Sequence, residues 1–178
     1  MRKHFTKKRV IVLAVAALAI GIGTGAYAFF NSSGHGTGAV AVGHSGAFTV
    51  TVNLATGGPM LPGGGESTYM EVTYTVANQT AAALQLNKVT ISIADADGNP
   101  WSVQTDLGKP ACTAADFELA VGAAGAFAAP PIEDTTVARN PLAAGDMVGS
   151  RVRVRMIETG ANQDNCQDAT VPLYLGAS

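Results

Sequence analysis

Short runs in which apolar and polar residues alternate recur through most of this chain of 178 residues. In the run from Ala47 to Leu54, Phe48, Val50 and Val52 share one face, and polar residues share the other. A period of two places alternate side chains on one face of a β-strand, so each run can bury one face. Gly- and Pro-rich stretches separate the runs and cannot continue a strand. The other predicted strands cover residues 67–77, 89–93, 117–121, 132–137, 151–157 and 169–175, with a further strand starting at Trp101.

Seven to nine short strands, with no long amphipathic helix after residue 30, predict an all-β fold. Strands that each bury one face favour two packed antiparallel sheets, a β-sandwich. The periodicity leaves immunoglobulin-like and jelly-roll topologies open. Pro172 lacks an amide donor, so the last strand is expected at a sheet edge, or with the amide side of Pro172 toward solvent.

The first thirty residues predict export. Five basic residues, all within residues 2–9, precede an uncharged run from Val10 to Phe30, and Ala26 and Ala28 form a small-x-small cleavage site. A basic region, an apolar region and such a site, in this order, are typical of a secretory signal, with Phe29 as the first mature residue. The uncharged run of 21 residues is also long enough to span a bilayer as a helix, so a hydrophobic N-terminal helix is expected before the β-sandwich. Retention as an N-terminal anchor, with the basic end cytoplasmic, therefore stays open.

These features predict a signal peptide or anchor in residues 1–28, a Gly- and Ser-rich linker or first strand in 29–45, and one β-sandwich domain in 46–178. The signal contains five of the eleven basic residues and none of the thirteen acidic ones, so the exported part is acidic. An acidic chain without a basic cluster disfavours nucleic acid and anionic lipid as partners. Membrane contact is expected only through residues 1–30.

Two cysteines, Cys112 and Cys166, lie in the predicted exported part. In an oxidising compartment such a pair favours one disulfide, which would close a loop of roughly 55 residues and stabilise the fold by about 4 kcal/mol. A metal site with two thiolates, or free thiols, are the alternatives, but no histidine or further cysteine lies nearby in the sequence.

Several turn motifs resemble those of known bacterial surface proteins. The stretch 61–64 (LPGG) precedes an alternating strand, the turn 78–80 (NQT) and a second strand. This order resembles bacterial surface β-sandwiches, including the camelysin/TasA group and immunoglobulin-like domains of cell-wall proteins. Residues 23–32 (GTGAYAFFNS) look like a camelysin/TasA signal, and residues 162–166 (NQDNC) look like small secreted proteins of high-GC Gram-positive bacteria.

The resemblance implies an exported β-sandwich at a bacterial cell surface, extracellular or anchored at its N-terminus. Camelysin-like proteins are associated with peptidase activity, and TasA-like proteins with extracellular fibres. The chain departs from both groups in its cysteine pair, and no histidine–carboxylate motif can be carried over as catalytic.

Two sequence patterns resemble metal sites but favour simpler interpretations. His35 and His44 are nine residues apart in a Gly-rich segment without a third local ligand, which favours solvated histidines. Asp95, Asp97 and Asn99 have the spacing that opens a calcium loop. Pro100 stands where that loop needs glycine, and no glutamate closes the loop, so a polar hairpin turn is preferred.

The alternating stretch Arg151, Arg153 and Arg155 is expected to face outward. Such a row favours a solvated face, paired with acids on a neighbouring strand, over a site for an acidic partner. Trp101 is expected in the core, with a sugar-stacking platform as the alternative. It precedes both cysteines, unlike the Cys–Trp–Cys order of antibody domains.

The functional prediction is an exported cell-surface protein with a structural or interaction role and no evident catalytic residue, cofactor or metal. Its partner is an unidentified protein or envelope component. The alternatives are a fibre subunit that self-assembles by strand exchange, with residues 31–54 as donor, and a camelysin-like peptidase.

Overall fold

The computed structural model describes residues 27–31, 40–41, 44–45, 48–53, 55–57, 60–63, 68–95, 97–167 and 169–178. For the first three of these ranges only the backbone is described. The hydrophobic N-terminal helix expected within residues 1–28 lies outside the described residues, apart from positions 27 and 28.

One layer of the fold is built around β6 (Met70–Asn78) and is called the β6 sheet. The β6 strand pairs with β14 (Met147–Met156) over eight residue pairs, from Met147↔Ala77 to Val154↔Met70. The remaining strands of this sheet are β11 (Phe117–Val121), beside β14, and β4 (Phe48–Val52), β3 (His44–Ser45) and β5 (Thr56–Gly57) on the other side.

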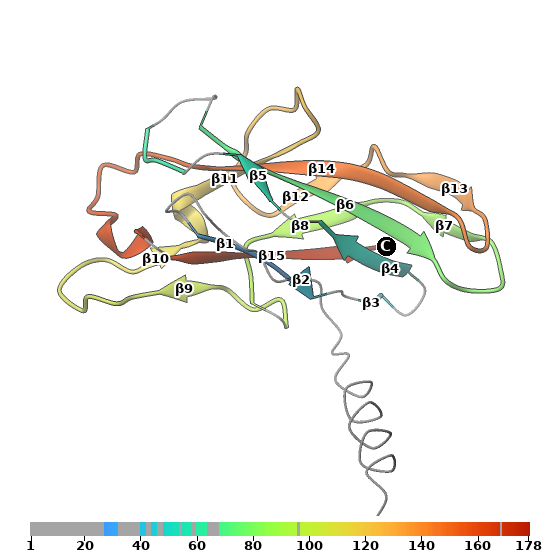
Figure 1. The fold of residues 1–178 in the computed structure, drawn as a ribbon, viewed down its shortest axis with the longest axis horizontal. Coiled ribbons are helices and arrows are strands. Elements are labelled where there is room, and N and C mark those ends of the chain that lie inside the picture. Colours follow the sequence, from blue (N-terminus) through green and yellow to red (C-terminus); the bar gives the residue numbers. More distant parts are fainter. Residues whose placement is uncertain are drawn as a thin grey trace, which may run out of the picture.

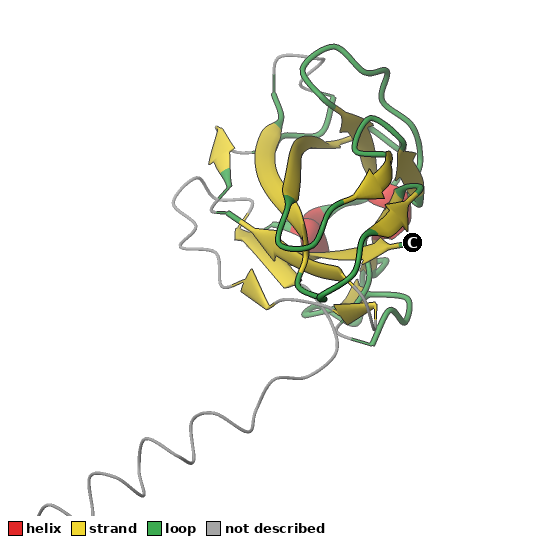
Figure 2. Ribbon diagram, turned by 90° about the vertical axis from the view of Figure 1, so that its right-hand side faces the viewer, coloured by secondary structure: helices red, strands yellow, loops and turns green. Residues whose placement is uncertain are grey.

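The second layer is built around β15 (Thr170–Ala177) and is called the β15 sheet. Its order is β12 (Ile132–Asp134), β8 (Val89–Ser92), β15, β1 (Tyr27–Asn31) and β2 (Val40–Ala41). Every pairing in both sheets is antiparallel. The two layers enclose a common interior (Figures 1 and 2), which confirms the predicted all-β sandwich.

Alternation explains which side chains form the core. In β6, Met70, Val72, Tyr74 and Val76 are buried, while Glu71, Thr73 and Thr75 are only partly covered on the opposite face. Strands β4, β8, β11, β14 and β15 bury alternate apolar residues in the same way and complete a single hydrophobic cluster. Burial of these faces on folding is the main force that holds the two sheets together.

In the described part of the chain, four short strands and two 3-10 helices lie outside the main sheets. Strand β7 (Leu84–Leu86) pairs with β13 (Arg139–Leu142), and β9 (Ser102–Val103) pairs with β10 (Cys112–Thr113). The 3-10 helices are η2 (Ala114–Asp116) and η3 (Asp164–Cys166). The strand expected to start at Trp101 is thus only two residues long and begins one residue later.

The β15 strand lies inside its sheet, between β8 and β1, and not at the edge. Its pairing with β8 covers only Tyr174 to Ala177, whereas Pro172 lies opposite Phe29 of β1. Pro172 therefore has a ladder partner on one side only. The proline is accommodated beyond the end of β8, where no amide donor toward that strand is needed.

Strands β2 and β3 and most of β1 lie in the segment 29–45. The sequence had left a linker and a first strand open for this segment. The β1 strand begins at Tyr27, inside the predicted signal region, and pairs with β15 from Tyr27↔Tyr174 to Asn31↔Thr170. The sandwich in this structure therefore starts before residue 46.

Candidate functional site

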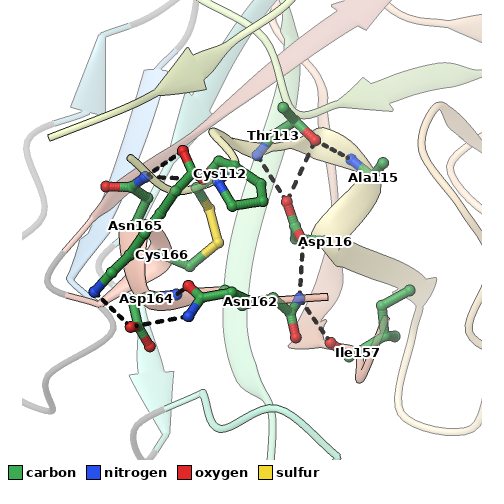
Figure 3. The surroundings of a disulfide bond; sticks show 12 residues. Cys112, Thr113, Ala115, Asp116, Ile157, Asn162, Asp164, Asn165 and Cys166 are labelled. Carbon is green, nitrogen blue, oxygen red and sulfur yellow. Dashed lines mark hydrogen bonds and ion pairs between the residues drawn. A yellow bond between two sulfur atoms is a disulfide. The ribbon is translucent and has the colours of Figure 1, made fainter. Parts of the chain in front are cut away.

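One end of the sandwich is closed by a disulfide between Cys112, the first residue of β10, and Cys166, the last residue of η3. Both cysteines are buried with 1% exposure, and their Cα atoms are 5.0 Å apart. This pairing agrees with the disulfide expected from the sequence. Residues 104–116 and 162–167 are called the disulfide end, and Figure 3 shows part of it, including Asp116 and Asn165 beside the two cysteines.

Asn165 organises the loop that faces the disulfide. Its Oδ1 accepts hydrogen bonds from the amide and hydroxyl of Thr105 and from the amide of Asp106, at 2.8–3.1 Å. Its Nδ2 donates to the carbonyls of Asp106, Lys109 and Pro110. Because Asn165 is 2% exposed, these bonds satisfy a buried amide completely and hold the loop in one conformation. The sequence offered no signal for this role beyond an asparagine next to a cysteine.

A carboxylate lies beside the disulfide. Oδ2 of Asp116 accepts hydrogen bonds from the amide and hydroxyl of Thr113, and the bond from the amide is part of the capping box of η2. Oδ1 of Asp116 accepts from Nε2 of Gln163, which also donates to the carbonyl of Ile157. A carboxylate oxygen of Asp116 and the two sulfur atoms all lie within 4.8 Å of one another. The sequence analysis missed this third donor because it considered only histidine and cysteine as further ligands, although Asp116 lies four residues after Cys112.

Charged side chains form the rim of the disulfide end. Nζ of Lys109 lies 2.7 Å from a carboxylate oxygen of Asp164 and 3.6 Å from one of Asp106. The hydrogen bond to Asp164 raises the pKa of Lys109 and lowers the pKa of Asp164. These pairs are solvent-exposed, so they orient the rim and add little stability. Leu107, between the two charged loop residues, is 86% exposed.

The arginines of β14 face away from the core, as predicted, and two of them pair with acids on neighbouring strands. Arg151 contacts Glu71 of β6 at 3.1 Å. Arg155 donates from both Nε and a terminal nitrogen to Oε2 of Glu118 on β11, at 2.9 and 2.6 Å. Both charges are therefore already compensated within the fold.

Arg153, in contrast, is only 7% exposed, so the expectation that it is solvated was wrong. It donates to the carbonyls of Gly122 and Gly125, at 2.9 and 2.6 Å. Its guanidinium also lies 5.2 Å from the ring centre of Tyr69 and 4.9 Å from that of Phe127. The loop after β11 folds over this arginine, which cannot serve as an open anion site in this conformation.

The segment from Asp95 to Asn99 forms a turn, in agreement with the preferred interpretation. Oδ1 of Asp95 accepts from the amides of Asp97 and Asn99, and Oδ2 accepts from the side chain of Asn99. The hydrogen bond from the Asn99 amide is the main cause that lowers the pKa of Asp95. The carboxylate of Asp95 is thus occupied by hydrogen bonds within the turn, in which Gly98 adopts a φ of 79°.

The other candidate residues do not converge on a site among the described residues. Trp101 is half-buried, with its ring centre 6.2 Å from that of Phe117, and packs against the core. His35 and Ala26 lie outside the described residues. The backbone of His44 lies in β3, and the backbones of Ala28 and Phe29 lie in β1.

No family model, curated protein or solved structure matches this chain. Within the described part of the chain, no helix is long and apolar enough to cross a membrane.

Proposed function

We propose that this protein is an exported, disulfide-stabilised β-sandwich with a structural or interaction role at a bacterial cell surface. The observation that carries the proposal is the buried disulfide between Cys112 and Cys166. Disulfides persist mainly in oxidising compartments outside the cytosol. The basic region and the apolar region within residues 1–28 independently support export from the cytosol.

The pairing of β1 gives its direction relative to the disulfide end. Because β1 is antiparallel to β15, its first residue lies opposite Tyr174 and its last opposite Thr170. Cys166 precedes Thr170 by four positions, so the last residue of β1 lies nearer the disulfide end than its first residue does.

Intact-mass measurement of the protein recovered from its host without reductant tests the proposal. We expect a mass that starts at Phe29 and is two hydrogens lighter than the reduced chain, and reduction of a matched sample should restore both hydrogens. A disulfide-bonded chain that retains residues 1–28 supports the anchored form. Two free thiols in freshly recovered protein contradict the proposal.

The pairing of β1 supports a second candidate, assembly by strand exchange. Only Tyr27 and Ala28 of β1 pair with β2, at Ala41 and Val40. Cleavage after Ala28 removes these two residues and leaves Leu173 and Tyr174 of β15 without their β1 partners. A strand from a second copy could add at this open edge through main-chain hydrogen bonds. The β1 strand lies almost entirely before the donor segment 31–54 that was expected from the sequence.

Light scattering over a range of concentrations tests this candidate. Chains that start at Phe29 should form particles that grow with concentration, whereas chains that retain residues 1–28, kept in detergent, should not. A peptide of residues 27–31 should slow the growth by occupying the open edge. A chain from Phe29 that remains monomeric at high concentration rules the candidate out.

A further inference from the structure

We propose that the disulfide end is a redox-gated metal site. When the disulfide is reduced, the thiolates of Cys112 and Cys166 and the carboxylate of Asp116 together hold one divalent cation of the zinc type. The proposal rests on the convergence of these three donors within 4.8 Å, at one end of the sandwich. It goes beyond the proposed structural role, which uses only the oxidised form.

The donor set suits zinc in both type and spacing. Zinc binds thiolate sulfur at about 2.3 Å and carboxylate oxygen at about 2.0–2.2 Å, so two sulfurs on a tetrahedral zinc lie about 3.8 Å apart. Cysteines with Cα atoms 5.0 Å apart can reach that separation by side-chain rotation once the sulfur–sulfur bond is broken. Three protein donors leave the fourth coordination position of a tetrahedral zinc for a water molecule. Two thiolates also favour zinc over magnesium or calcium, which prefer oxygen donors.

Hydrogen bonds from two neighbouring residues hold the carboxylate of Asp116 beside the two sulfur atoms. A carboxylate offers about four lone-pair positions, and three are used by the bonds from Thr113 and Gln163. One position remains for a cation. Hydrogen bonds of this kind fix ligand orientation in metal sites. Two of the three donors, Cys112 and Asp116, are four residues apart, and η3 contributes the third.

The gating step is a two-electron reduction. A phosphine attacks one sulfur and the sulfur–sulfur bond breaks. Water then converts the phosphorus adduct into the phosphine oxide and supplies the two protons of the resulting thiols. Binding of the cation displaces these two protons to solvent, because the thiolate is the ligand. In the oxidised chain neither sulfur carries a charge, and the site does not bind the cation.

Cadmium titration of the full-length chain in mild detergent tests the proposal, because cadmium–thiolate bonds give an ultraviolet charge-transfer band. After anaerobic reduction with a phosphine, the band should saturate at one cadmium per chain and disappear when zinc is added. The oxidised chain should show no band. Asp116→Asn should weaken binding about tenfold or more. Asp106→Asn, at the rim of the same end, should leave the affinity unchanged.

The near-ultraviolet circular dichroism of Trp101 reports whether the reduced chain is folded. If reduction unfolds the chain, zinc should restore the native spectrum, because metal binding is then coupled to folding. A folded, reduced chain without a charge-transfer band overturns the proposal, as does an unfolded one that zinc does not restore. Equal affinities of the wild type and Asp116→Asn also overturn it, since the carboxylate is then not a ligand.

Discussion

The hydroxyl of Tyr74 donates a hydrogen bond to Oδ2 of Asp134 across the interior of the sandwich, at 2.5 Å. Tyr74 belongs to the centre of the β6 sheet and Asp134 to the edge strand β12 of the other sheet. Asp134 is fully buried, and its Oδ1 accepts from the amide and hydroxyl of Thr136. Burial, followed by the contact with Asp134, raises the pKa of Tyr74 far above its ordinary value. The pair is therefore a neutral phenol that donates to a buried carboxylate.

This carboxylate should make stability depend on pH. Burial alone raises the pKa of Asp134, but hydrogen bonds from Ser150, Thr136 and Tyr74 outweigh it and hold the pKa below the ordinary 3.8. A folded-state pKa below the unfolded value contributes stability that is present above the ordinary pKa and is lost as pH falls through the folded pKa. Urea unfolding over an acid pH series should show this loss.

The variant Asp134→Asn should flatten that acid dependence, because an amide does not titrate in this range. Asp97→Asn, in an exposed turn, serves as the matched control and should keep the wild-type profile. An Asp134→Asn profile as steep as the wild type would show that other carboxylates cause the acid loss.

Asn165→Ala should destabilise the disulfide end. The change removes the hydrogen-bond partner of several partly buried amides and carbonyls of the loop 105–110, and a buried group left without a partner costs about 1–3 kcal/mol. We expect a loss of at least about 2 kcal/mol in the free energy of urea unfolding. Hydrogen exchange at the amides of Thr105 and Asp106 should accelerate more than exchange in β6. Uniform acceleration throughout the chain would contradict a local role.

Replacement of both cysteines by alanine should lower the free energy of unfolding by about 4 kcal/mol, since the disulfide closes a loop across a sequence separation of 54 residues. Chemical denaturation of the double variant measures the loss, and near-ultraviolet circular dichroism checks that the native packing survives. A loss below about 1 kcal/mol would mean that the denatured chain is already constrained by residual structure.

Arg153→Lys should destabilise the loop over β14, although the charge is kept. A lysine cannot supply the planar fork that reaches the carbonyls of Gly122 and Gly125, nor stack in the same way on Phe127. We expect a loss of about 1–2 kcal/mol, because hydrogen bonds to charged groups contribute about 1.5–3 kcal/mol each and lysine retains part of this. Thermal and urea unfolding measure the change.

Arg151→Lys is the matched control for that variant, on the same strand and face. Its side chain is 48% exposed, and surface substitutions usually change stability by less than about 0.5 kcal/mol. Equal effects of the two lysine variants would show that the contacts of the buried Arg153 do not add to the free energy of unfolding.

The sequence analysis predicted the long strands because their burial is one-sided. Alternation identified β4, β6, β8, β11, β14 and β15, and the paired cysteines agree with the structure. It did not find β7, which ends an Ala- and Leu-rich stretch, or β13, which contains Pro141, because the residues around these two strands do not alternate between apolar and polar. For Arg153 it predicted the correct face but the wrong environment, because a distant loop covers that part of the face.

The sequence by itself determined the class of fold, since an apolar residue at every second position can be buried only by packing one sheet on another. It also determined that two cysteines were available to pair. Only the tertiary structure decided which strands are neighbours, that Asn165 and Asp134 are buried, and that Asp116 lies beside the disulfide. The physical reason is that these contacts join residues far apart in the chain. Local periodicity carries no information about such pairs, whereas the packing of the two sheets brings them together.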